Sequence, residues 1–147
     1  MGVLYRSQAV LTSSAWLDKF EDIMSYITAH WDGLVLITGD MNFDLLGIPD
    51  APKRRYLSLL DTFSVKQVIN QLTRITKNSR TLIDHFIVND TLKVTATGVI
   101  PFAIVSDHDG PFASYQPRYK YLRNLKNVDE KAFLNDFAAL PVTDINL

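Results

Sequence analysis

Three short polar segments carry residue types that could perform hydrolytic chemistry. The first spans residues 39–42, where Asp40 and Asn42 follow the apolar run 34–37. A carboxylate in such a position can orient a water molecule or accept its proton, and an amide NH2 can donate to a phosphate oxygen as negative charge develops. Gly, Asp and Asn are also the residues that turns favour, so this segment by itself favours a surface turn over a functional site.

The second segment is Thr81-Leu82-Ile83-Asp84-His85, at the start of a run over residues 81–88 that alternates enough to predict a strand. An ionised Asp84 inside an apolar strand is unfavourable unless it is paired. Adjacent residues of a strand point to opposite faces, so His85 is not its partner, and Asp84 needs one from elsewhere. The alternative interpretation is an edge strand with a solvated Asp84 and a His85 satisfied by packing and one hydrogen bond.

The third segment, residues 106–111, follows another β-rich run. Asp107 could bind a hard cation through oxygen, because Mg2+ prefers one or two carboxylates together with substrate phosphate. His108 could pair with Asp84, which would fix the tautomer of the imidazole and raise its basicity. A tight turn is the simpler explanation. A Ser–His–Asp hydrolase is disfavoured because nothing around Ser106 resembles a nucleophile elbow.

The three segments are more specific together than apart, because all of them follow or lie within predicted strands of one small protein. They supply a water-activating carboxylate, an Asp–His pair, a metal-binding carboxylate and an amide donor (Asp40, Asp84, His108, Asp107 and Asn42). This set suits Mg2+-assisted attack of water on a phosphodiester.

The elements that must position these residues alternate between helices and strands, which predicts an α/β fold. A helix is expected after the candidate N-caps Ser13 and Ser14, because apolar residues recur there at helical spacing as a core-facing stripe (Trp16, Phe20, Ile23, Met24, Ile27 and Trp31). A second helix is expected over residues 56–63. Strands are expected at residues 34–38, 81–88, 112–115 and 94–104, the last broken near Gly98 and Pro101, with a strand or connection at 65–71.

Composition bounds the class of protein. The 147 residues fit one domain, and the absence of cysteine excludes disulfides, thiolate zinc sites and cysteine nucleophiles. No apolar run approaches the roughly 18 residues of a membrane span, so no membrane partner is expected. The net charge of −1 hides an excess of basic residues over 53–80 and again over 118–126. Such segments could hold a phosphate backbone, although solvated loops and helix faces are the simpler explanation.

The composition changes at residue 117. A basic stretch leads there into an apolar helical pattern at Phe133, Phe137 and Leu140. We therefore divide the chain into a domain over residues 1–116 and a basic linker with a short helix over residues 117–147.

The ordered motifs resemble the endonuclease/exonuclease/phosphatase family, and most closely the endonuclease domain of LINE-type, jockey-like non-LTR retrotransposons. The matching segments are Leu4-Tyr5-Arg6-Ser7 and residues 37–46, 73–89 and 106–112, in the family's order. The resemblance covers nearly the whole chain. It implies the C-terminal half of a two-sheet α/β sandwich of the DNase I-like kind, and it makes residues 117–147 the stretch that leads to a reverse transcriptase.

The resemblance also implies roles for individual residues. Asp40 would orient or deprotonate the attacking water, and Asn42 would contact the scissile phosphate or that water. Asp84 would pair with His108, which would stabilise charge developing on the phosphate. The remaining implied roles are a metal ligand at Asp107 and contacts to the substrate phosphate or its surroundings at Tyr5, Thr73 and Ser106.

The cofactor implied by the resemblance is Mg2+ or Mn2+, and the implied partners are double-stranded DNA and a reverse transcriptase domain. The family's N-terminal half normally brings a strand-end asparagine and the glutamate that is the principal metal ligand. By motif, neither Glu21 nor Glu130 can replace that glutamate. We therefore expect the sequence to hold the second half of the nuclease domain, to bind the metal less tightly, and to have weak or no activity.

Three functions remain open at this level. The first is a Mg2+-dependent DNA endonuclease of a retrotransposon. The second is a phosphatase or deadenylase with the same fold, which would not need the basic segments. The third is a non-catalytic remnant or interaction module.

Overall fold

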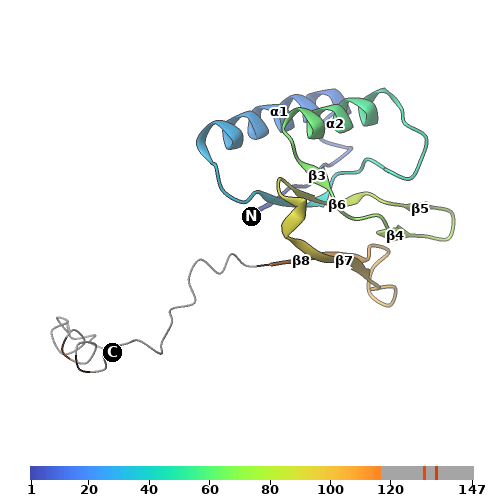
Figure 1. Ribbon diagram of the computed structural model, residues 1–147. Coiled ribbons are helices and arrows are strands. Elements are labelled where there is room, and N and C mark those ends of the chain that lie inside the picture. The colour runs from blue at the N-terminus through green and yellow to red at the C-terminus, as the bar shows by residue number, and fades with distance from the viewer. Residues whose placement is uncertain (117–130, 132–134, 136–147) are drawn as a thin grey trace, which may run out of the picture. The chain divides into compact units, whose positions relative to one another are not determined.

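The computed structural model describes residues 1–116 together with Lys131 and Asn135 (Figure 1). Residues 1–116 form one compact unit. The predicted linker and short helix over residues 117–147 lie outside the described residues, apart from those two positions. Within the described part of the chain, every helix is too short or too polar to cross a membrane.

Two α-helices and eight short strands build the unit. The helices are α1 (Ser13–His30) and α2 (Ala51–Thr62), with a 3-10 turn, η1 (Thr91–Lys93). The strands are β1 (Gly2–Val3), β2 (Leu36–Asp40), β3 (Lys66–Gln67), β4 (Arg74–Ile75), β5 (Arg80–Thr81), β6 (Asp84–Val88), β7 (Val94–Ile100) and β8 (Gly110–Tyr115).

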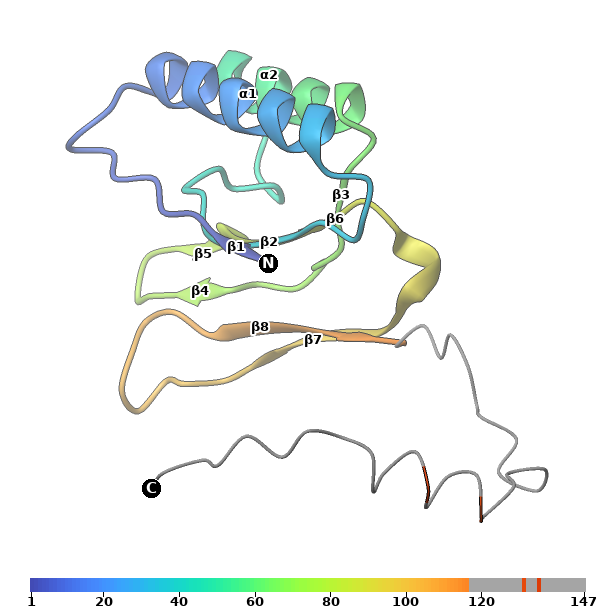
Figure 2. The ribbon, with the colours of Figure 1, turned by 90° about the vertical axis from the view of Figure 1, so that its left-hand side faces the viewer.

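The unit is layered. A four-stranded sheet in the order β1-β2-β6-β3 lies at its centre, with β1 parallel to β2 and the other neighbours antiparallel. Both helices cover one face of this sheet, and the β7–β8 hairpin lies on the opposite side, as Figures 1 and 2 show from two directions. The small β4–β5 hairpin projects beside them. This arrangement confirms the predicted mixed α/β fold.

The helices cover the sheet with an aromatic core. Trp16, Phe20 and Met24 of α1 are buried as the spacing predicts, and they pack with Tyr56 of α2. The prediction was wrong about the N-cap and about the width of the buried stripe. The N-cap is Thr12, whose hydroxyl accepts from the Ala15 N–H, rather than Ser13 or Ser14. In addition, Ile23 and Trp31 are exposed, because the buried stripe is narrower than the predicted one.

The second helix begins earlier than predicted. Asp50 caps it by accepting from the Lys53 N–H, and Pro52 occupies the first turn, where its missing N–H leaves no hydrogen bond unmade. Local cap chemistry therefore starts the helix before the first apolar residue of the periodic pattern.

The predicted strand over residues 81–88 is divided into β5 and β6. The interruption falls at Leu82 and Ile83, which are buried and whose N–H groups donate to the side chains of Asp44 and Thr73 instead of to a strand. Strand β7 shows the reverse: it runs through Gly98 and ends just before Pro101, so only the second predicted break is present.

The end of β2 is fixed by a close approach of two backbones. Gly39 has φ +140°, and a Cβ atom built there would lie 1.8 Å from the Leu4 carbonyl oxygen. Leu4 donates its N–H to the Thr38 carbonyl at 2.9 Å. Glycine is therefore required where the N-terminal segment crosses the end of β2.

Candidate active site at the strand ends

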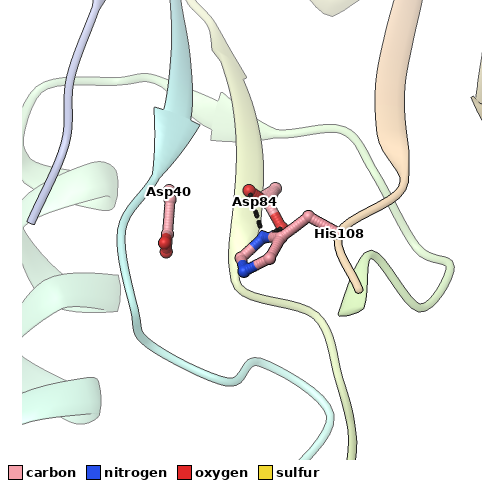
Figure 3. Close-up of side chains that lie close together, drawn as sticks. All are labelled: Asp40, Asp84 and His108. Carbon is pink, nitrogen blue, oxygen red and sulfur yellow. Dashed lines mark hydrogen bonds and ion pairs between the residues drawn. The ribbon is translucent and has the colours of Figure 1, made fainter. Parts of the chain in front are cut away.

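Three ionisable side chains meet where β2 ends and β6 begins. Asp40 and Asp84 lie opposite one another in the β2–β6 register, and His108 reaches them from the loop before β8 (Figure 3). One ligand atom from each of the three lies within 4.8 Å of the others. Residues from three separate parts of the sequence thus form one polar cluster at the edge of the apolar core.

Asp84 and His108 are in direct contact. The His108 Nδ1 lies 3.0 Å from Asp84 Oδ2 and 3.2 Å from Oδ1. Because an ionised carboxylate only accepts, Nδ1 carries the proton and donates it to Asp84, so Nε2 is the free atom of the neutral ring. The Ser106 hydroxyl accepts from the His108 N–H at 3.0 Å, which fixes the backbone that carries the ring.

Asp40 is the carboxylate with the perturbed acidity. Partial burial raises the pKa of Asp40, and the like charge of Asp84 raises it further. The hydrogen bond from the Asn42 N–H to Asp40 Oδ1, at 2.9 Å, and the nearby His108 and Arg6 act in the opposite direction. A carboxylate whose pKa moves toward neutrality is a better proton acceptor than an ordinary surface aspartate.

Thr73, expected to contact the substrate phosphate or its surroundings, lies behind Asp84 as a backbone acceptor. It is fully buried, and its hydroxyl accepts from the N–H groups of Ile83, at 3.1 Å, and Asp84, at 2.9 Å. Ile83 precedes β6, and Asp84 is its first residue. Thr73 therefore holds the backbone of Asp84 in place.

Asn42 lies beside the cluster in a left-handed conformation, with φ 52°. Its side-chain NH2 donates to the Arg6 carbonyl at 2.8 Å. Asparagine tolerates this region of φ better than most residues. One N–H of the amide remains for another acceptor, which is compatible with the expected contact to phosphate or water.

Asp107 lies outside the cluster. Its carboxylate forms a salt bridge with Arg74, 2.8 Å from both Nε and Nη2, and the hydrogen bond from Arg74 lowers the pKa of Asp107. The Arg74–His108 backbone bridge brings the two segments together. The structure thus gives Asp107 a cationic partner at the place where the sequence suggests a metal. Tyr5 is largely exposed and Ser106 is exposed.

Comparison with solved structures identifies this architecture. The endonuclease domain of TRAS1, a telomere-specific non-LTR retrotransposon, superposes with TM-score 0.62 at 12% identity, over 76% of this chain and 54% of that domain. An endonuclease/exonuclease/phosphatase family protein from Leptotrichia buccalis C-1013-b gives TM-score 0.50 at 20% identity, over 66% of this chain and 42% of that one. The chain has the fold of an endonuclease/exonuclease/phosphatase domain. It spans about half the length of these structures.

The shared fold confirms the resemblance drawn from the ordered motifs. No protein-family model and no curated protein matches the chain.

Two buried residues support the endonuclease/exonuclease/phosphatase fold at the site and were not identified from the sequence as doing so. His85 accepts at Nδ1 from the Tyr56 hydroxyl, at 2.8 Å, and donates from Nε2 to the Phe43 carbonyl, at 3.0 Å. Burial lowers the pKa of His85 to about 4, so the ring is neutral. Burial also raises the pKa of Tyr56. An Asp–His dipeptide in a strand is the signal: one side chain faces the site, so the other must face the core.

Arg6 and Asp44 also act at the site through the backbone. Arg6 is buried and donates to the carbonyls of Met41 and Asn42. Asp44 accepts from the N–H groups of Leu46, at 3.1 Å, and Leu82, at 3.0 Å. Both residues tie the loop after β2 to distant segments. The spacing of residues in the sequence contains no signal for such contacts.

The cluster has the chemistry of a divalent-cation site. Two carboxylates supply the hard oxygen donors that Mg2+ and Mn2+ prefer, and one ring nitrogen of His108 lies in the same cluster. Glu21, which lies on α1, is engaged instead with Arg55 at 3.1 Å. The residues present fit such an ion, with few protein ligands around it.

Proposed function

We propose that this chain carries the site of a metal-dependent phosphodiester hydrolase, the DNA endonuclease of a non-LTR retrotransposon. The observation that carries the proposal is the meeting of Asp40, Asp84 and His108 at adjoining strand ends, with the relevant atoms within 4.8 Å. The fold shared with the TRAS1 endonuclease domain supports the same reaction class. A cluster of two carboxylates and an oriented imidazole is suited to moving protons at a phosphate.

Each residue of the cluster has a role that follows from its surroundings. Asp40, with its raised pKa, accepts a proton from the attacking water or orients that water. His108 is held by Asp84 through Nδ1, which leaves Nε2 available for a phosphate oxygen on which negative charge develops. When the ring is protonated, Nε2–H donates to that oxygen. The remaining N–H of the Asn42 amide supplies a further donor.

A divalent cation would be held by the carboxylates of Asp40 and Asp84. When bound, Mg2+ or Mn2+ supplies positive charge that stabilises the developing charge on the phosphate. Two carboxylates without a glutamate make a weak site for an ion that usually keeps several waters. We therefore expect low metal affinity and slow hydrolysis.

Double-stranded DNA is the substrate that the charge distribution favours. The β4–β5 hairpin carries Arg74, Lys77 and Arg80 with no acid between residues 73 and 81, and Arg74 adjoins His108 through the backbone bridge. Lys77 and Arg80 are exposed. Cations at these positions can contact successive phosphates of a nucleic-acid backbone, whereas binding of a small phosphate ester does not require these cations. In a full-length retrotransposon, the 3′ hydroxyl at the nick would prime DNA synthesis by an attached reverse transcriptase domain.

The test is the nicking of supercoiled plasmid by the purified chain at millimolar Mg2+ or Mn2+. We expect slow conversion to open circles that carry 3′-hydroxyl ends extendable by a DNA polymerase. Asp40→Asn and His108→Ala should abolish it, and so should removal of the metal by a chelator. Asp61→Asn, which changes an exposed carboxylate on α2, is the matched control and should leave it unchanged.

Two results would reject the proposal in different ways. Release of phosphate from small esters without nicking would favour a phosphatase. If neither substrate is consumed while the chain still melts cooperatively, a non-catalytic interaction module is the better explanation.

A further inference from the structure

The most completely buried cation near the site belongs to Arg6, which is 4% exposed. Its guanidinium donates to the Met41 carbonyl at 2.6 Å, to the Asn42 carbonyl at 2.5 Å and to the Ser13 hydroxyl at 3.1 Å. It also stacks over the Phe43 ring, with its central carbon 4.1 Å from the ring centroid. A buried arginine with this many partners is fixed in one position.

The loop after β2 needs these donors. Strand β2 ends at Asp40, so the carbonyls of Met41 and Asn42 have no neighbouring strand to accept from, and Met41 is fully buried. Buried carbonyls without a donor are strongly unfavourable. The planar guanidinium fork serves both carbonyls at once from donors held in a fixed geometry, Nε to Met41 and Nη2 to Asn42.

The contacts between the two segments are reciprocal. The Arg6 N–H donates to the Asp40 carbonyl at 2.9 Å, and the Asn42 side chain donates back to the Arg6 carbonyl at 2.8 Å. The Asn42 N–H in turn donates to Asp40 Oδ1 at 2.9 Å. The position of the Asp40 carboxylate therefore depends on the conformation of Asn42, which Arg6 fixes from both sides.

The other end of this network is the start of α1. Ser13 is the first residue of that helix, and the Phe43 ring belongs to the core cluster that contains Trp16. Arg6 thus connects the rigid helical layer to the loop that carries Asp40 and Asn42.

We propose that Arg6 is a positioning residue, which holds the loop of residues 41–43 in the conformation that presents Asp40 and Asn42 to the scissile phosphate. Its consequence for hydrolysis rests on the function proposed above. Its consequence for the geometry of the loop does not.

The geometric part is tested by amide hydrogen exchange in the full chain. Arg6→Met removes the donors but keeps a stem of similar length, and Arg6→Lys keeps the charge without the fork. We expect the Asn42 amide, bonded to Asp40 Oδ1, to exchange at least about tenfold faster in Arg6→Met, with Arg6→Lys in between. Amides that pair β2 with β6, such as that of Ile87, should keep the wild-type rate.

The functional part is tested by nicking kinetics. We expect Arg6→Met to lower kcat by about 10- to 100-fold with little change in KM, because misplaced groups lose transition-state contacts more than substrate binding. Arg6→Lys should recover part of that loss. Arg54→Met is the control, since exposed Arg54 donates to one carbonyl, that of Pro49 at 2.7 Å, and takes no part in the contacts of Arg6.

The outcomes separate this inference from the proposed function. If the wild-type chain does not nick DNA, the proposed function fails, and exchange of the Asn42 amide still decides the role of Arg6. Unchanged exchange at Asn42 in both variants overturns the inference. Equal acceleration at Asn42 and Ile87 also overturns it, because Arg6 would then contribute only to global stability.

Discussion

Replacing Thr73 with valine should show how much the Thr73 hydroxyl stabilises the backbone that carries Asp84. Valine keeps the shape of threonine but removes the hydroxyl that accepts from the N–H groups of Ile83 and Asp84. Both donors then lose their acceptor, that of Ile83 in a buried and that of Asp84 in a partly buried setting. A buried donor without an acceptor costs about 1–3 kcal/mol, so we expect Thr73→Val to lower the free energy of unfolding by about 2–4 kcal/mol.

The measurement is urea unfolding followed by tryptophan fluorescence, for which the buried Trp16 is the reporter. Thr73→Ser keeps the hydroxyl and loses only a methyl group, at a cost of about 1 kcal/mol. Thr62→Val is the matched control: this exposed hydroxyl donates to the Ser58 carbonyl on α2, and its removal should change stability by less than about 0.5 kcal/mol. The reasoning is refuted if Thr73→Val is as stable as wild type, or if Thr73→Ser loses as much as Thr73→Val.

Three further expectations follow from the same structure. Burial lowers the pKa of His85 to about 4 from an unfolded value of 6.5, so the unfolded state binds the proton first. Stability should therefore fall by up to about 3 kcal/mol as the pH drops from 6.5 to about 4, measured as the urea midpoint against pH, with a flatter profile for His85→Gln. Gly39→Ala should lower the free energy of unfolding by about 3 kcal/mol or more in thermal melts, because φ is +140° and the added Cβ meets a backbone carbonyl. Gly2→Ala is the control and should be nearly neutral, because the nearest neighbour of its Cβ would be a side-chain atom at 3.9 Å. Lys77→Ala combined with Arg80→Ala should weaken DNA binding and reduce the slope of log affinity against log salt by about 1.8, measured by fluorescence anisotropy.

Each of these expectations has a contrary result. A His85→Gln chain with the wild-type pH profile would show that another group controls acid unfolding. Equal melting of the Gly39→Ala and Gly2→Ala chains would contradict the close approach of the two backbones. An unchanged salt slope would remove the β4–β5 hairpin from the DNA contact.

Much of the fold could be predicted from the sequence, because local periodicity reflects the buried face of each element. The spacing of Trp16, Phe20 and Met24 predicts the packed face of α1, and the end of an apolar run locates β2. Boundaries were less predictable. Asp50 starts α2 early through a cap, and the strand expected over residues 81–88 divides because Asp44 and Thr73 take its backbone donors.

The sequence by itself determined which chemistry is available: Asp40, Asp84 and His108 are polar residues at the ends of apolar runs, in an order that a known nuclease family shares. Only the tertiary structure decided how the other candidates are used. Thr73 is buried as a backbone acceptor, and Asp107 has Arg74 as its partner. The physical reason is that a side chain's role depends on which distant backbone and charged groups folding brings within hydrogen-bonding reach, and residue type and local spacing do not contain those long-range contacts.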